Sequence, residues 1–147
     1  MKKLFVVIAA VMCSAAFAGD LRLENGRYET VAYIREDGRI EDAFFELLGH
    51  IREETENDAT ILRIEACDFE VLGYVRDDEA QDPNGMKLYD LTGDGRIRDN
   101  RLRNMGSIRD DGTVEGSDFR VILYTDGTQR NLKPRLLAYL VFFSTLL

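Results

Sequence analysis

Histidine is nearly absent from the 147-residue sequence, and this limits the catalytic chemistry that we can predict. A Ser-His-Asp triad would have to use His50, the one histidine. His50 lies between Gly49 and Ile51 in a predicted strand, and we expect it to be an exposed or partly buried strand residue. The 27 acidic residues would place some carboxylate pair at a distance suited to glycoside hydrolysis in any fold, so such a pair is uninformative. No catalytic residue is predicted, and a non-enzymatic protein is favoured over a glycan-active enzyme.

Basic residues are also few. The sequence has 19 lysines and arginines against 27 acidic residues, a net charge of −8. An acidic surface repels phosphate backbones, so no nucleic-acid partner is expected.

No apolar run is long enough to cross a bilayer, which takes about 20 residues. The N-terminal run from Leu4 to Ala16 follows Lys2 and Lys3, and Ala16-Phe17-Ala18 supplies small residues at the two positions that a signal peptidase needs. This pattern is typical of a cleaved export signal, so residues 1–18 are predicted to be a signal peptide. The mature domain would span 19–147 without a transmembrane segment, and it would be periplasmic, on the outer-membrane surface or secreted.

The two cysteines give no internal disulfide. Cleavage of the signal removes Cys13, and use of Cys13 for lipidation is disfavoured because Met12, rather than a small residue, precedes it. Cys67 then stands alone in an apolar stretch, and we expect it to be buried and inert. An intermolecular bridge and a reactive thiol remain open alternatives.

A short turn motif recurs along the chain. It reads "YIREDGRIED" from Tyr33, "YDLTGDGRIRDN" from Tyr89 and "GSIRDDGTVEG" from Gly106, with weaker copies from Gly49, Gly73 and Leu123. The equivalent apolar positions are Ile34, Ile51, Val75, Leu91, Ile108 and Leu123. Their spacing indicates an internal repeat of about 17 residues over 33–130.

The motif has the residues of a β-hairpin with a three-residue loop. In the first copy Arg35 and Arg39 share one face while Ile34 and Ile40 share the other. The loop suits a type I turn followed by a left-handed residue, a conformation in which glycine has no Cβ penalty. The predicted structural turn residues are Gly38, Gly95, Gly112 and Gly127.

The stretch from Asp90 also resembles a calcium loop, because Asp90, Thr92 and Asp94 alternate before Gly95. A calcium-binding loop of this kind requires a bidentate Glu at its twelfth position, and this position, counted from Asp90, is Arg101. The hairpin turn explains the pattern without a metal, so no metal site or cofactor is predicted. These three residues are the calcium candidates of the alternative hypothesis, a calcium-dependent binding protein, which could also use the acidic loop with Asp77, Asp78 and Asp82.

Side-by-side packing of the hairpins predicts an all-β fold, since one hairpin cannot bury its apolar face alone. A ring or barrel of about five short hairpins would leave no exposed edge, and an open solenoid is the alternative. Pro83-Asn84-Gly85 predicts an exposed loop within the irregular stretch 77–87.

The apolar C-terminal segment, 134–147, differs from the repeats. It is too short for a membrane span, and we expect it to pack on or in the ring, either as a closing strand or as a helix. An exposed patch for a partner or a membrane surface is the alternative. Pro134 is expected to mark the break between the ring and this segment.

The motif copies and the Phe-rich end resemble the five-fold β-flower proteins, small exported proteins of Gram-negative bacteria. Their hairpin repeats, of the type I-G-x-I-x-x-D-G-x-V-x-D, are arranged about a pseudo-fivefold axis. The resemblance covers the chain from Tyr33 onward and departs from the pattern at 49–61 and 77–87. It implies an all-β ring with pseudo-symmetry, and no catalytic residues.

These observations favour an exported, non-enzymatic binding or interaction module. Its partner would be a protein or a glycan, which the sequence does not identify.

Overall fold

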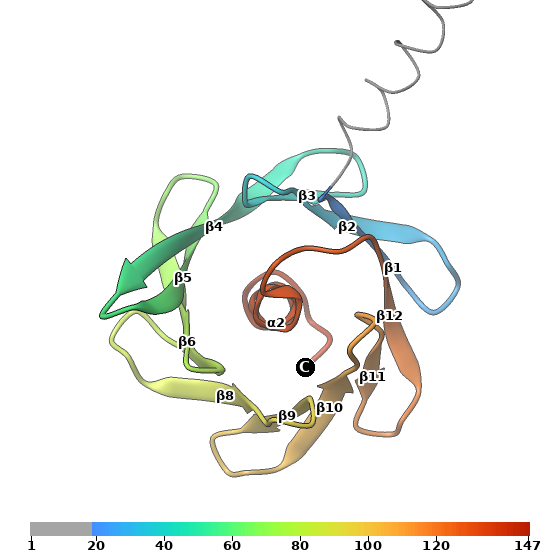
Figure 1. Cartoon of the computed structure of the whole chain (residues 1–147). Helices are drawn as coiled ribbons and strands as arrows, with labels where there is room; N and C mark the ends of the chain where they lie inside the picture. The colour runs from blue at the N-terminus through green and yellow to red at the C-terminus, as the bar shows by residue number, and fades with distance from the viewer. Residues whose placement is uncertain (1–18) are drawn as a thin grey trace, which may run out of the picture.

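The computed structural model describes residues 19–147, so the predicted signal peptide lies outside the described residues. Alternating apolar residues form twelve strands, and one helix follows them (Figure 1). The strands are β1 (Leu21–Glu24), β2 (Thr30–Ile34), β3 (Arg39–Asp42), β4 (Leu47–Glu56), β5 (Ala59–Ala66), β6 (Val71–Arg76), β7 (Glu79–Gln81), β8 (Lys87–Leu91), β9 (Arg96–Asp99), β10 (Asn104–Ile108), β11 (Val114–Gly116) and β12 (Val121–Asp126). The helix is α2 (Leu132–Phe142).

The strands form a closed antiparallel barrel. Each strand pairs with its neighbours in the chain, and β12 pairs with β1, where Leu23 lies opposite Thr125. Closure leaves no strand edge unpaired, which is the physical advantage expected for a ring of short hairpins. The predicted all-β ring or barrel is confirmed, and the open-solenoid alternative is wrong.

Five hairpins have their turns at the same end of the barrel, between β2 and β3, β4 and β5, β6 and β7, β8 and β9, and β10 and β11. We call this end the glycine end, after Gly38, Gly95 and Gly112. The pairing of β12 with β1 adds a sixth two-stranded unit. The sequence, interpreted as about five hairpins, does not predict this unit, because no turn motif joins β12 to β1.

Three glycine-end turns have the expected three-residue geometry. In the first, Arg35 N–H donates to the Arg39 carbonyl and Gly38 N–H donates to the Arg35 carbonyl, at 2.8 and 3.0 Å. The φ angles of Gly38, Gly95 and Gly112 are 92°, 90° and 84°. The β4–β5 and β6–β7 turns instead use residue pairs with positive φ, Asn57-Asp58 and Asp77-Asp78, as in a type I′ turn.

The last copy of the motif differs from the expected alignment. Leu123 lies opposite Val114 as Gly49 lies opposite Ile40, so Leu123 corresponds to Gly49 and not to Ile51. Thr125 takes the position expected for Leu123. Gly127 also has a positive φ, 109°, but it lies between β12 and α2 and not in a hairpin.

Every second strand carries a β-bulge near the other end of the barrel, and the unpaired residue is always apolar. The unpaired residues are Val31, Leu48, Leu72, Leu88, Met105 and Ile122. A bulge bends its strand and increases the local twist, which helps short strands to curve into a barrel.

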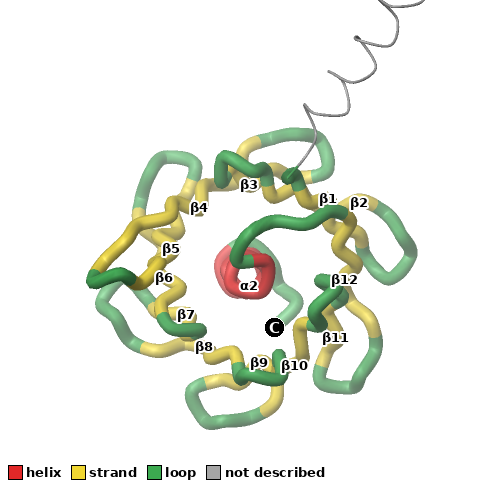
Figure 2. The backbone as a smooth tube through the Cα atoms, in the orientation of Figure 1, coloured by secondary structure: helices red, strands yellow, loops and turns green. Residues whose placement is uncertain are grey.

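Helix α2 lies inside the barrel (Figures 1 and 2). Barrel diameter grows with strand number, and about eight strands leave an interior that side chains alone can fill. Twelve strands leave more room, and the helix fills it with fully buried Leu136, Leu137 and Leu140. A Cβ on Gly49 or Gly73 would lie 2.6 Å from the ring of Phe143 or Phe142, so these glycines make space for the helix.

The C-terminal segment is therefore a helix packed against the barrel, and a closing strand is wrong. Pro134 does not separate the ring from the segment, because α2 begins at Leu132 and Pro134 lies in its first turn, where a missing N–H costs nothing. Within residues 19–147, no helix has the length and apolar character needed to span a membrane.

Candidate binding face

Six turns at the end opposite the glycine end share one backbone geometry. In each, the first residue donates its N–H to the fifth carbonyl, and the fourth residue donates its N–H to the first carbonyl, at 2.8–3.1 Å. The turns are 25–29, 42–46, 66–70, 82–86, 99–103 and 116–120. We call this end the aromatic end.

An Asx side chain opens four of these turns and fixes their shape. The Asp42 carboxylate accepts hydrogen bonds from the N–H groups of Phe44 and Glu46, at 2.8 and 2.9 Å. Asn25, Asp82 and Asp99 accept the equivalent pairs of bonds. Asp therefore stands at these positions for turn geometry, and the sequence needs no metal to explain it.

The fourth residue of each turn has a left-handed backbone, a conformation that glycine adopts without strain. Only the 82–86 turn has glycine there. Bulky apolar residues occupy the other five, namely Tyr28, Phe45, Phe69, Leu102 and Phe119, with φ between 63° and 69°. Left-handed backbone costs an L-residue roughly 1–2 kcal/mol, so the same strain recurs five times.

Stacking on the outer wall offsets part of this strain. Phe45 stacks on Tyr33 with ring centroids 5.1 Å apart, and Tyr28 stacks on Tyr124 at 4.7 Å. Phe69 stacks on His50 at 5.2 Å. The three turn residues nevertheless stay 60–68 % exposed, so the wall covers only one face of each ring.

All the exposed large apolar side chains of residues 19–147 lie at the aromatic end. They are Tyr28, Phe44, Phe45, Leu47, Phe69, Met86, Leu102, Phe119 and Leu146. We call this set the apolar crown. The turns that carry most of it spread outward around the barrel opening (Figure 2). Phe44, at 84 % exposure, is the most exposed member.

A cavity of about 290 Å³ opens beside the C-terminal tail at the same end. It is lined by Asn25, Val31, Ile122, Leu123, Tyr139, Phe143, Ser144, Thr145 and Leu146. Burial of the Tyr139 ring raises the pKa of its phenol, because the charged phenolate is disfavoured away from water. The cavity extends the apolar character of the crown into the barrel.

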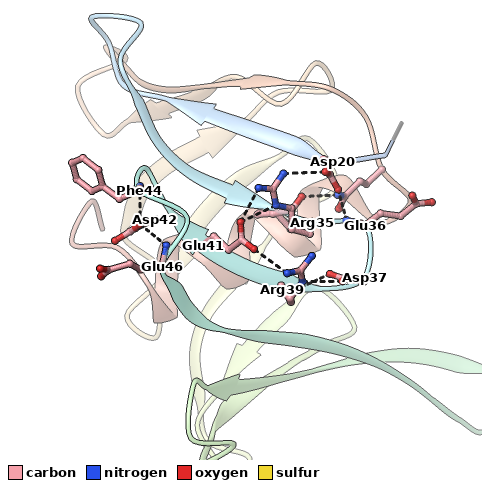
Figure 3. A network of polar contacts seen from close by, with 11 residues as sticks. Asp20, Arg35, Glu36, Asp37, Arg39, Glu41, Asp42, Phe44 and Glu46 are labelled. Carbon is pink, nitrogen blue, oxygen red and sulfur yellow. Dashed lines mark hydrogen bonds and ion pairs between the residues drawn. The ribbon is translucent and has the colours of Figure 1, made fainter. Parts of the chain in front are cut away.

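Ion pairs cover the outer wall between the two ends. Figure 3 shows Arg35 between Asp20 and Glu41, at 3.0 and 2.8 Å, and Phe44 directed away from this network. Asp90 with Arg98, Glu65 with Arg52 and Glu115 with Arg109 repeat the arrangement. The least exposed carboxylates of the wall thus each have a guanidinium partner.

At the glycine end, a second network fixes α2 to the barrel. The buried Arg135 donates to Glu53 at 2.9 Å and to Gln129 at 3.0 Å, and Gln129 donates to the Ile34 carbonyl at 2.8 Å. The hydrogen bond from Arg135 lowers the pKa of Glu53. A cavity of about 320 Å³ lies beside this network, with both acidic and basic lining groups.

The calcium candidates have other partners in the structure. Asp90 accepts two hydrogen bonds from Arg98, at 3.1 and 2.6 Å, and these lower the pKa of its carboxyl. Thr92 donates to Asp94 within the hairpin turn. Of the acidic-loop residues, Asp77 and Asp78 lie at the glycine end, while Asp82 opens a turn at the aromatic end.

The other two residues considered for chemistry lie on the outside of the barrel. His50 lies beneath Phe69 on the wall and is partly buried, as expected for a strand residue. Cys67 is exposed at the second position of the 66–70 turn, so the expectation that it is buried is wrong.

Sequence reasoning missed the apolar crown. The signal is present as Asn25-x-x-Tyr28, Asp42-x-x-Phe45 and Asp99-x-x-Leu102, an Asx residue three positions before a large apolar one. The pattern does not predict an exposed apolar side chain, because a bulky apolar residue is not an expected left-handed residue.

Fold and face together define a class: a closed twelve-strand antiparallel barrel, filled by its own helix, with one apolar end. Comparisons with family models, curated proteins and solved structures found no match to this chain.

Proposed function

We propose that the protein is an exported, non-enzymatic binding module that acts through the apolar crown. The observation that supports this is the placement of every exposed large apolar side chain of residues 19–147 at one end. Large exposed apolar patches on soluble proteins mark interaction sites. Bulky residues in strained backbone are also a feature of functional surfaces.

The non-enzymatic part rests on how the polar groups are used. The least exposed carboxylates of the wall are held by arginines, and the Asx residues of the aromatic end are held by backbone N–H groups. The predicted signal at 1–18 and the likeness to five-fold β-flower proteins support export to the periplasm, the outer-membrane surface or the medium. Mass spectrometry of exported material should find a chain that begins near Gly19, and an intact Met1 would contradict export.

A photo-crosslinking experiment tests the binding proposal. The photoreactive residue p-benzoylphenylalanine replaces Phe44 in the crown or, as a control, Arg39 on the wall near the glycine end. In cells that export the protein, we expect a crosslinked product of defined mass from position 44 and none from position 39. The product should disappear when Phe119→Ser is added to the crown. No product at 44, or equal products at both positions, would contradict the proposal.

A further inference from the structure

Charge is unevenly distributed around the apolar crown. Three consecutive turns, 42–46, 66–70 and 82–86, contain five acidic residues and no basic one, and we call them the acidic half. The acidic residues are Asp42, Glu46, Asp68, Glu70 and Asp82. The other three turns, 99–103, 116–120 and 25–29, contain Arg27, Arg101, Arg103 and Arg120, and we call them the arginine half.

The arginine half exposes positive charge that an acidic partner could contact. Its four arginines are exposed, and its three acidic residues are Asp99, Asp118 and Glu29. Asp99 pairs with Arg103 at 2.7 Å, while Asp118 pairs weakly with Arg120 at 3.6 Å. Arg27 and Arg101 have no ion-pair partner among residues 19–147. The acidic half of the aromatic end is therefore negatively charged, and the arginine half carries a small excess of positive charge.

This division makes the face complementary to itself. A two-fold axis that lies in the face, along the boundary between the halves, places the acidic half of one copy on the arginine half of the other. Turn order around the closed barrel then sets the contacts. In the resulting pairs, turn 25–29 of one copy meets turn 42–46 of the other. In the same way, turn 66–70 meets turn 116–120 of the other copy, and turn 82–86 meets turn 99–103.

Each of these contacts joins opposite charges and apolar tips. Arg27 faces Asp42 and Glu46, next to Tyr28 and Phe44. In the second contact Arg120 faces Asp68 and Glu70, next to Phe69 and Phe119. In the third, Arg101 and Arg103 face Asp82, next to Met86 and Leu102. Complementary charge sets register and excludes wrong partners, while apolar burial supplies affinity.

We propose that two copies of this chain bind crown to crown as a two-fold dimer with this pairing of turns. The inference rests on the proposed function, in which the crown is the binding surface. It identifies the partner bound there as a second copy of the chain. An anionic lipid surface fits less well because the acidic half repels it. An isologous interface is formed by the same surface on both subunits. A protein with one apolar end therefore has the one surface that such an interface requires.

The experiment measures the dimer dissociation constant of the full mature chain by sedimentation equilibrium. Arg27→Glu with Arg120→Glu places like charges across two of the three contacts and should raise the constant on the order of a hundredfold. Adding Glu46→Arg and Glu70→Arg to this variant restores the wild-type net charge and restores opposite charges at these two contacts, with their signs exchanged. The four-site variant should dimerise nearly as well as the wild type.

A matched control changes the same net charge at the glycine end. Arg96→Glu with Arg130→Glu should leave the dissociation constant within about twofold of wild type, since neither residue lies at the crown. Thermal melting of each variant shows that it is folded. A wild-type chain that stays monomeric at all concentrations overturns the dimer. So does a four-site variant that remains as weak as the two-site one.

Failure of the dimer and failure of the proposed function give different results. A monomer that still crosslinks through position 44 to another species keeps the binding function and overturns only the dimer. A monomer that gives no product at position 44 overturns both.

Discussion

At the level of single residues, the left-handed backbone conformation is used in two ways at the two ends of the barrel. Gly38, Gly95 and Gly112 adopt it where the chain is tightly packed, and a Cβ on Gly38 would lie 2.0 Å from the Ile51 carbonyl oxygen. At the aromatic end Phe45 and Phe69 adopt it where the side chain is exposed. Glycine is required in the first case, and in the second a large side chain is presented at the cost of strain.

Gly112→Val is expected to lower the free energy of unfolding by about 1–3 kcal/mol, because a β-branched residue is strained at positive φ. The φ of Gly112 is 84°, and a Cβ would also lie 2.8 Å from the Thr125 Cβ. Gly93→Val is the control, since nothing lies within 4 Å of a Cβ there, and it should change stability by less than about 1 kcal/mol. Denaturant unfolding measures both, and equal stability of the two variants would contradict the turn geometry.

Sequence patterns predicted the glycine turns because their residues follow local rules. The Asp-Gly pair and the flanking alternation of apolar and polar residues report the hairpin directly. The exposed positions of Tyr28, Phe45 and Phe69 were not predicted, because their backbone breaks the usual preference and each ring stacks on a strand residue distant in the sequence. Such contacts between a turn and a distant part of the chain have no local signature.

At the level of elements, α2 takes the place of side chains that a smaller barrel would use as its core. Six successive residues of this helix, 135–140, are buried, which is more than one full turn, so burial runs all round the helix and no amphipathic pattern marks it. A helix buried all round is apolar all round. For that reason the sequence identified the segment as buried but left strand and helix open.

Leu137→Ala should destabilise the protein by about 2–5 kcal/mol, the range for creating a cavity at a fully buried leucine. Leu137 is completely buried in the barrel, whereas Leu146 is 42 % exposed. Leu146→Ala is therefore the matched control and should cost less than about 1 kcal/mol. Thermal or denaturant unfolding decides, and a Leu137→Ala variant as stable as the control would place the helix outside the barrel.

Removal of the whole segment after Pro134 is a stronger test of the same contact. Each buried leucine contributes roughly 1.5–3 kcal/mol before entropy, so several together rival the net stability of a typical domain. We expect the truncated chain to unfold or aggregate, as size-exclusion chromatography and circular dichroism would show. A soluble, monomeric and equally stable truncated chain would contradict the filled barrel.

The ion pair between Arg135 and Glu53 gives α2 a pH-dependent anchor. The pKa of Glu53 is lowered in the folded state, so its contribution to stability is present above the ordinary value of 4.5 and is lost as the pH falls through the folded value. The stability difference between wild type and Glu53→Gln should thus be largest near pH 7 and shrink below about pH 4.5. Denaturant unfolding across this range measures it, and a difference that does not vary with pH would contradict the anchor.

At the level of the whole molecule, the two ends of one barrel expose different kinds of side chain. The wall holds its least exposed carboxylates in ion pairs, and the Arg135 network at the glycine end fixes the helix to the barrel. The aromatic end leaves the apolar crown in solvent. The alternation of turns along an up-and-down barrel separates the two sets, since every second turn falls at the same end. The turn motif predicted the glycine end, while the sixth unit depends on a pairing between β12 and β1, at opposite ends of the strand order.

Hydroxyl-radical footprinting of the crown tests the central claim, that this end is the binding face, most directly. The oxidation rates of Tyr28, Phe44, Phe45, Phe69 and Phe119 are compared between dilute purified protein and the protein in intact cells that export it. Tyr139, which is 5 % exposed, serves as the internal standard for a buried ring. We predict that the crown residues oxidise several-fold more slowly in cells, relative to exposed residues of the glycine end. Equal protection at both ends, or crown residues as reactive in cells as in dilute solution, would contradict the account.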